Sequence, residues 1–236
     1  MENRAGLYKL LPFLFLSQLF FMENRNSSAA TAFNPDEAVL MTVNDEPVYV
    51  QEFMNKLYEY RAEIFNAGAG MKDSALIIQM ARHKAMNDMI RLKVQQILMK
   101  EHGIAQDISY PAFLRNFERS NEMRRKAMQE NNVIYGPVQY TEKGFFNYTF
   151  SNNLIRLKQM LSMKALLVRE DQLKQYYEEQ KNTLFRSGNT CRPYAEVRNY
   201  VLARCIDLQY DNYVNERVAK ASVVINQTLF GQLTIQ

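Results

Sequence analysis

Glycine and proline are scarce in this sequence, and tryptophan is absent. The 236 residues include 8 glycines and 6 prolines, which is about half of the roughly 12% that these two residues usually make up together. This scarcity disfavours a turn-rich β-sandwich, a collagen-like repeat and a flexible linker protein, and it favours long helices. The length suffices for one globular core or two small ones, at about 150 residues per domain.

Cysteine and histidine are also rare. Two cysteines cannot build a disulfide scaffold or a cysteine-rich zinc site, and two histidines without an HExxH motif give no sign of a zinc hydrolase. We therefore expect no catalytic residues, no bound metal and no cofactor. His83 falls in the middle of a helical pattern and His102 at a helix end, neither in a catalytic context. A straight helix from Pro193 would hold Cys205 too far from Cys191 for a disulfide, which predicts two free thiols.

Charge of one sign is not concentrated anywhere. The 29 basic and 25 acidic residues are mixed along the chain, so we expect no nucleic-acid partner. The densest basic stretch, Arg115–Lys126, contains Glu118 and Glu122 and has no platform of stacking aromatics, which favours a solvated helix face over a polyanion or lipid-headgroup patch. The neighbouring carboxylates of Glu170–Asp171 and Glu178–Glu179 point in different directions on a helix, which argues against paired-carboxylate catalysis.

The first 32 residues have the pattern of an export signal. Two basic residues precede the apolar run Leu10–Met22, and the small-residue triplet Ala30–Ala32 follows it. This run is shorter than the roughly 20 apolar residues that span a bilayer, which favours a signal peptide cleaved before Phe33. The charged segment Glu23–Arg25 leaves an uncleaved membrane anchor open as the alternative. Residues 33–236 are then expected to form a single domain.

The mature chain is predicted to be mainly helical, with a small β-hairpin and a last strand. Two strands, Val39–Val43 and Pro47–Val50, flank a tight turn, and a third strand candidate is Ser222–Asn226. Periodicity and caps predict six helices: from about Phe53 to before Gly68, Asp73 to His102, Ser109 to Glu130, Thr141 to Leu161, Arg169 to Asn182, and from Pro193 past Val218. Their expected core positions include Ile64, Met89, Leu98, Phe146, Leu157, Val197, Val201 and Leu208. Gly103 is expected to cap the second helix in the left-handed conformation, with Ile104 folding back on Met99.

The order of these elements resembles the SurA and PrsA family of extracytoplasmic chaperones. The similarity lies in Val39–Val48 leading to Glu52-Phe53, in Met89–Leu98 leading to His102-Gly103-Ile104, and in Val168–Tyr177, Pro193–Val197 and Ala221–Ile225. The resemblance implies a SurA N-terminal-like helical chaperone domain, with its last strand returning to the first hairpin. It therefore predicts that Val223 and Ile225 share a core with Val39 and Val43.

The family usually inserts a parvulin prolyl isomerase where this chain has only Arg186–Arg192. None of the parvulin motifs occurs elsewhere in the sequence. We therefore expect an exported protein, located in the periplasm, outside the cell or in the cell envelope. It is expected to bind unfolded or nascent exported polypeptides without ATP and not to be an enzyme. A prolyl-isomerase-related foldase and an extracytoplasmic scaffold with one dedicated partner remain alternatives, and a retained N-terminal segment would bind the membrane.

The thirteen methionines and 28 phenylalanines and tyrosines provide adaptable apolar side chains. Those at regular helical spacing, such as Met86, Met89 and Phe150, are expected to fill the core. Aromatic residues away from these stripes are the candidates for client contact: Phe65, Tyr135, Tyr140, Phe145 and Tyr148.

Overall fold

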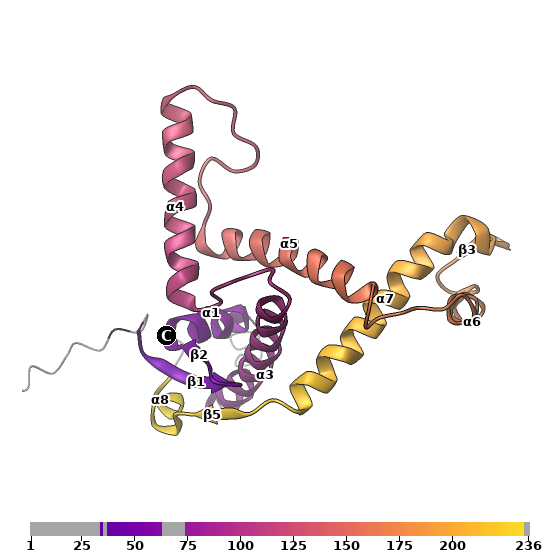
Figure 1. Ribbon diagram of the computed structural model, residues 1–236. Coiled ribbons are helices and arrows are strands. Elements are labelled where there is room, and N and C mark those ends of the chain that lie inside the picture. The colour runs from indigo at the N-terminus through magenta and orange to yellow at the C-terminus, as the bar shows by residue number, and fades with distance from the viewer. Residues whose placement is uncertain (1–33, 35–36, 63–73, 234–236) are drawn as a thin grey trace, which may run out of the picture. The chain divides into compact units, whose positions relative to one another are not determined.

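The structure is a computed structural model that describes residues 34, 37–62 and 74–233 (Figure 1). Within these residues it has seven helices and two small antiparallel sheets, so the mainly helical fold expected from the sequence is confirmed. The elements are β1 (Val39–Val43), β2 (Glu46–Tyr49), α1 (Val50–Glu59), α3 (Ser74–Glu101), α4 (Tyr110–Gln129), α5 (Glu142–Ser162), α6 (Glu170–Gln180), β3 (Arg186–Ser187), β4 (Thr190–Cys191), α7 (Tyr194–Ala219), β5 (Val223–Ile225) and α8 (Gln227–Gln232). Residues 1–32, the predicted export signal, lie outside the described residues.

The last strand pairs with the first hairpin, as predicted. The sheet has the order β2-β1-β5, and Met41 and Val43 lie opposite Ile225 and Val223 in antiparallel register. Asn44 and Asp45 have φ values of 46° and 66°, which suits a tight hairpin turn. Asn44 also binds the chain just before β5, because its amide donates to Ser222 O and its Oδ1 accepts from Ser222 N, both at 2.8 Å.

The expectation that Val39 belongs to the core is wrong. Val39 is 39% exposed, whereas Leu40, Met41 and Val43 are buried. The pairing of β1 with β2 shifts register between Val39 and Met41. Such an irregularity breaks the alternation of the strand, so two consecutive side chains face inward and Val39 faces out.

Helix α3 lies in the main core, which also contains residues of α1, α5, α7 and the first hairpin. Its predicted positions Met89 and Leu98 are buried. Gly103 ends the helix with φ of 68°, Gly103 N donates to Lys100 O, and Ile104 N donates to Met99 O at 2.8 Å. These two bonds form a Schellman motif, as predicted. Helix α1 ends at Glu59, and Ile64 lies outside the described residues.

Side-chain caps begin α4 and α5 where the sequence predicts them. Ser109 Oγ accepts from Ala112 N at 3.3 Å, and Thr141 Oγ1 accepts from Gly144 N at 3.1 Å. Satisfying these free amide groups fixes where each helix starts. The two caps therefore determine which side chains of α4 and α5 meet at the site described below.

A second, smaller cluster packs α6 against the first half of α7. Its buried members are Leu173, Phe185, Val197, Val201 and Cys205. Between the two helices, β3 and β4 form a short hairpin whose turn contains Gly188 with φ of 61°. The predicted core position Leu208 is wrong: buried positions of α7 fall at residues 197, 201, 205, 210 and 214, and Leu208 is exposed between them.

Helix α8 was not predicted. Asn226 Oδ1 accepts from Leu229 N at 3.1 Å and begins this six-residue helix. Phe230 then contacts Phe53 edge-on, with ring centroids 5.8 Å apart, so the chain beyond β5 packs against the main core. In the described part of the chain, no helix combines the length and apolarity needed to cross a bilayer.

Candidate functional site

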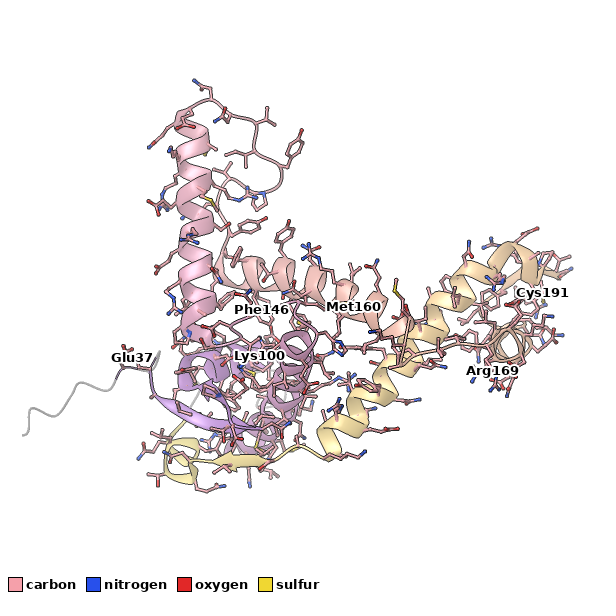
Figure 2. All side chains as sticks on the ribbon, in the orientation of Figure 1. Glu37, Lys100, Phe146, Met160, Arg169 and Cys191 are labelled. Carbon is pink, nitrogen blue, oxygen red and sulfur yellow. The ribbon has the colours of Figure 1, made fainter. Side chains whose placement is uncertain are left out.

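A partly open cavity of about 340 Å³ lies among α1, α3, the start of α4 and the start of α5. Its walls are mainly apolar, formed by Met89 and Leu92 of α3, Ile108, Phe113 of α4 and Phe146 of α5. Figure 2 labels Phe146 on the first turns of α5. The volume falls within the range of about 300–1,000 Å³ that is typical of ligand sites.

A polar network crosses one wall of the cavity. Glu142, the first residue of α5, accepts through Oε1 from Asn55 Nδ2 at 2.6 Å and from the Tyr110 hydroxyl at 2.9 Å. Asn55 Oδ1 in turn accepts from Gln51 Nε2 at 3.1 Å. The network joins α1, α4 and α5 at the cavity and fixes the Glu142 carboxylate there.

An ion-pair group lies at the rim. Glu59 binds Lys56 at 2.7 Å and Lys143 at 3.4 Å, and both lysines line the cavity. Partial burial raises the pKa of Glu59, but the two lysines outweigh this effect and leave its pKa below the ordinary value. Glu59 is therefore ionised at neutral pH and neutralises part of the lysine charge.

A buried ion pair lies at the base of the same region. Lys93 is 0% exposed, and its Nζ donates to Glu52 Oε1 at 3.0 Å and to the carbonyl of Ile108 at 3.4 Å. Glu52 Oε2 also accepts from Tyr49 N at 3.3 Å. Burial raises the pKa of Glu52, and Lys93 counteracts only part of this rise. The pair ties α1 to α3 and to the chain that precedes α4.

The five predicted client residues differ in how exposed they are. Tyr135 and Tyr148 are 86% and 55% exposed, and Tyr140 is half-buried. Phe145 is only 8% exposed, so its expected place on the surface is wrong. Its ring packs on Phe113 and Phe117 of α4, because α4 covers a second face of this end of α5.

Phe65, the remaining predicted client residue, lies outside the described residues. Tyr140 contacts both Phe145 and Tyr148, with ring centroids 5.6 Å and 5.7 Å away. The structure thus brings Tyr140, Phe145 and Tyr148 together, but none of these three residues lines the cavity. Tyr148 and Tyr135 remain available as surface contacts.

The loop between α4 and α5 is fixed by two side chains of α4. Asn121 is buried, and it accepts from Tyr140 N at 2.8 Å while donating to Tyr140 O at 3.0 Å. Arg124 donates to the carbonyls of Tyr135 and Pro137 and stacks over the Tyr140 ring at 4.4 Å. This part of the basic stretch is therefore structural, and it holds an ordered loop whose apolar side chains are exposed.

Many of the exposed large apolar side chains fall into two groups. One group surrounds the α4–α5 loop: Met123, Met128, Val133, Tyr135, Val138 and Tyr148. The other lies along the later part of α5, the chain after it and α7: Ile155, Met160, Met163, Leu167, Tyr200 and Leu208. Where such side chains adjoin one another, they can form an interaction surface.

The remaining predicted groups have structural roles. Glu170 accepts from Arg198 at 2.6 Å and from the Tyr194 hydroxyl at 2.7 Å, which lowers the pKa of Glu170 and ties α6 to α7. Cys191 and Cys205 are both free thiols, and burial raises the pKa of Cys205. No cluster of histidine, cysteine and carboxylate side chains suited to a metal ion occurs among the residues that the structure describes.

Comparisons with protein-family models, with curated proteins and with solved structures give no match. The cavity is thus the strongest local evidence for function. Sequence reasoning missed it because its lining comes from four separate segments. The nearest signal was the aromatic position Phe146, which the periodicity assigned to the core.

Proposed function

We propose that this chain is an exported, ATP-independent chaperone-like protein, related in fold to the SurA and PrsA family but without a parvulin domain. It holds unfolded polypeptides by apolar contact and thereby lowers the free concentration of aggregation-prone chains. Covalent chemistry and a cofactor play no part in this mechanism.

The observation that carries the proposal is the partly open, apolar-walled cavity among α1, α3, α4 and α5. A polypeptide segment can place a side chain against these apolar walls, while the exposed apolar groups on α4, α5 and α7 contact the flanking chain. Methionine and aromatic side chains repack easily, which suits binding to unrelated sequences. The return of β5 to the first hairpin adds support for the family resemblance.

The prolyl isomerase alternative has less support. In the described residues, only 181–193 connect α6 and α7, and this connection holds the β3–β4 hairpin. The scaffold with one dedicated partner would use the same surfaces, so it differs from the chaperone only in the range of proteins bound.

The test is suppression of aggregation of several unrelated, chemically denatured clients, followed by light scattering without ATP. Asn147 lines the cavity from the exposed side of α5, so Asn147→Trp should obstruct the cavity and weaken suppression. Asn152→Trp, an exposed asparagine on the same helix away from the cavity, is the matched control and should act like the wild type. Circular dichroism verifies folding of both variants.

A wild-type protein that suppresses aggregation of no client contradicts the chaperone proposal. Suppression confined to a single client favours the dedicated scaffold. Equal suppression by wild type and folded Asn147→Trp moves client binding from the cavity to the exposed groups.

A further inference from the structure

The cavity contains one carboxylate without a cationic partner. Glu52 pairs with Lys93, and Glu59 pairs with Lys56 and Lys143. Glu142, by contrast, has only neutral donors: Asn55 and Tyr110 both bind its Oε1. Among the described residues, no salt bridge reaches this carboxylate, and its Oε2 accepts no side-chain hydrogen bond.

The neutral donors orient the carboxylate without neutralising it. Because Asn55 and Tyr110 hold Oε1 from α1 and α4, the position of Oε2 is set before any ligand arrives. The dipole at the start of α5 stabilises the negative charge of Glu142. It does not donate a hydrogen bond to Oε2. A bound group that donates hydrogen bonds and carries positive charge would complete the site.

The walls determine what the rest of that group must be. Met89, Leu92, Phe113 and Phe146 line the cavity, and these surfaces favour an aliphatic stem over a hydrated ion. Gln96 lines it too, and its Oε1 is a buried acceptor that has no hydrogen-bond donor in the described part of the chain. The cavity thus combines apolar walls with two acceptors, Glu142 Oε2 and Gln96 Oε1, that have no side-chain donor in the described part of the chain.

We infer that the cavity takes an arginine side chain of the bound polypeptide, with its aliphatic stem against Phe113 and Phe146 and its guanidinium on Glu142 Oε2. This inference rests on the proposed function and names the class of segment that the protein prefers: an apolar stretch with an arginine inside it. Arginine fits better than lysine because its planar fork carries five donors, enough for Glu142 and a second acceptor.

The test compares two short apolar peptides that differ at one position. Each carries a single tryptophan, and the central residue is arginine in one and citrulline, its uncharged analogue, in the other. The protein has no tryptophan, so fluorescence anisotropy of the peptide tryptophan reports binding directly. We expect the arginine peptide to bind wild-type protein about tenfold more tightly than the citrulline peptide.

The variant Glu142→Gln removes the charge and keeps an oxygen for Asn55 and Tyr110. It should bring the affinity ratio of the two peptides close to one while leaving the affinity for the citrulline peptide unchanged. Glu118→Gln, an exposed glutamate of α4 outside the cavity, makes the same change in net charge and should preserve the ratio. Should Glu142→Gln not fold, raising the ionic strength from about 0.05 M to about 0.5 M should reduce the wild-type preference for arginine.

The outcomes separate the inference from the proposed function. Equal binding of both peptides to wild type overturns the arginine site and leaves the chaperone proposal standing. A tenfold preference that survives in folded Glu142→Gln also overturns the site. Binding of neither peptide, together with no suppression of client aggregation, overturns the proposed function itself.

Discussion

The buried ion pair between Glu52 and Lys93 makes the sharpest prediction about stability. Removing one partner of a buried pair leaves an uncompensated charge and typically costs about 3–5 kcal/mol. Lys93 is fully buried, and its only described polar contacts are Glu52 and the carbonyl of Ile108. We therefore expect Lys93→Met to lower the free energy of unfolding by about 4 kcal/mol, a large share of the roughly 5–15 kcal/mol of a typical domain.

The double variant Glu52→Gln/Lys93→Met should recover most of this loss, because it buries no charge. Glutamine at position 52 retains an acceptor for Tyr49 N. Replacing both members of a buried pair is often neutral or even stabilising. We expect the double variant to lie within about 1 kcal/mol of the wild type.

The loss in Lys93→Met should also depend on pH. Burial already raises the pKa of Glu52 above its ordinary value of 4.5, and removing Lys93 takes away the main effects that lower it. A carboxyl whose pKa is higher in the folded state contributes stability below its unfolded pKa and loses that contribution as the pH rises through the folded pKa. The deficit relative to wild type should thus be smallest near pH 4.5 and largest above the folded pKa.

Urea denaturation followed by circular dichroism measures these differences. At a slope of about 2 kcal/mol per molar urea, a loss of about 4 kcal/mol lowers the midpoint by about 2 M. Lys100→Met is the control, because this exposed lysine of α3 pairs with Glu46 at the surface and should shift the midpoint little. An unchanged midpoint in Lys93→Met, or a double variant no more stable than the single one, would refute this reasoning.

Three further predictions concern the ends of the chain and its chemistry. Truncation after Ala221 removes β5 and the Phe230 contact with Phe53, and differential scanning calorimetry should show the melting temperature falling by about 10 °C or more; an unchanged melting temperature contradicts the closed sheet. In a protease-coupled assay, the purified protein should leave proline-peptide isomerisation at its uncatalysed rate, and clear acceleration would restore the isomerase alternative. N-terminal sequencing of the exported protein should find a start at Phe33; an intact membrane-bound form supports the anchor, and a soluble cytoplasmic full-length protein contradicts both.

Local signals predicted the element boundaries well because they act within a few residues. Ser109 and Thr141 cap helices through amides three residues away, and Gly103 adopts a positive φ that its missing side chain permits. The pairing of β5 with β1 came instead from the family resemblance, since no local signal links strands so far apart. The six-residue α8 escaped prediction because it is too short to show periodicity.

The wrong burial predictions concern side chains whose surroundings depend on a neighbouring helix or strand. Periodicity assumes one buried face for each helix, but α4 covers a second face of α5 and buries Phe145. Likewise, the irregular register at Val39 breaks the alternation on which strand patterns depend. The cavity and the buried Lys93 were beyond reach for the same reason: each depends on how α1, α3 and the start of α4 meet in space.

The pairing of β1 with β5 has a consequence for how the protein is made. About 180 residues separate the two strands, and a ribosome adding about 5–20 residues per second needs roughly 10–40 s to synthesise that interval. During this time the edge of β1 that faces away from β2 has no partner strand. An unpaired strand edge is a template for pairing with other chains. The nascent β1–β2 hairpin is thus at risk of aggregation until β5 is synthesised. Correct folding therefore requires that nascent chains do not associate with one another before β5 pairs with β1.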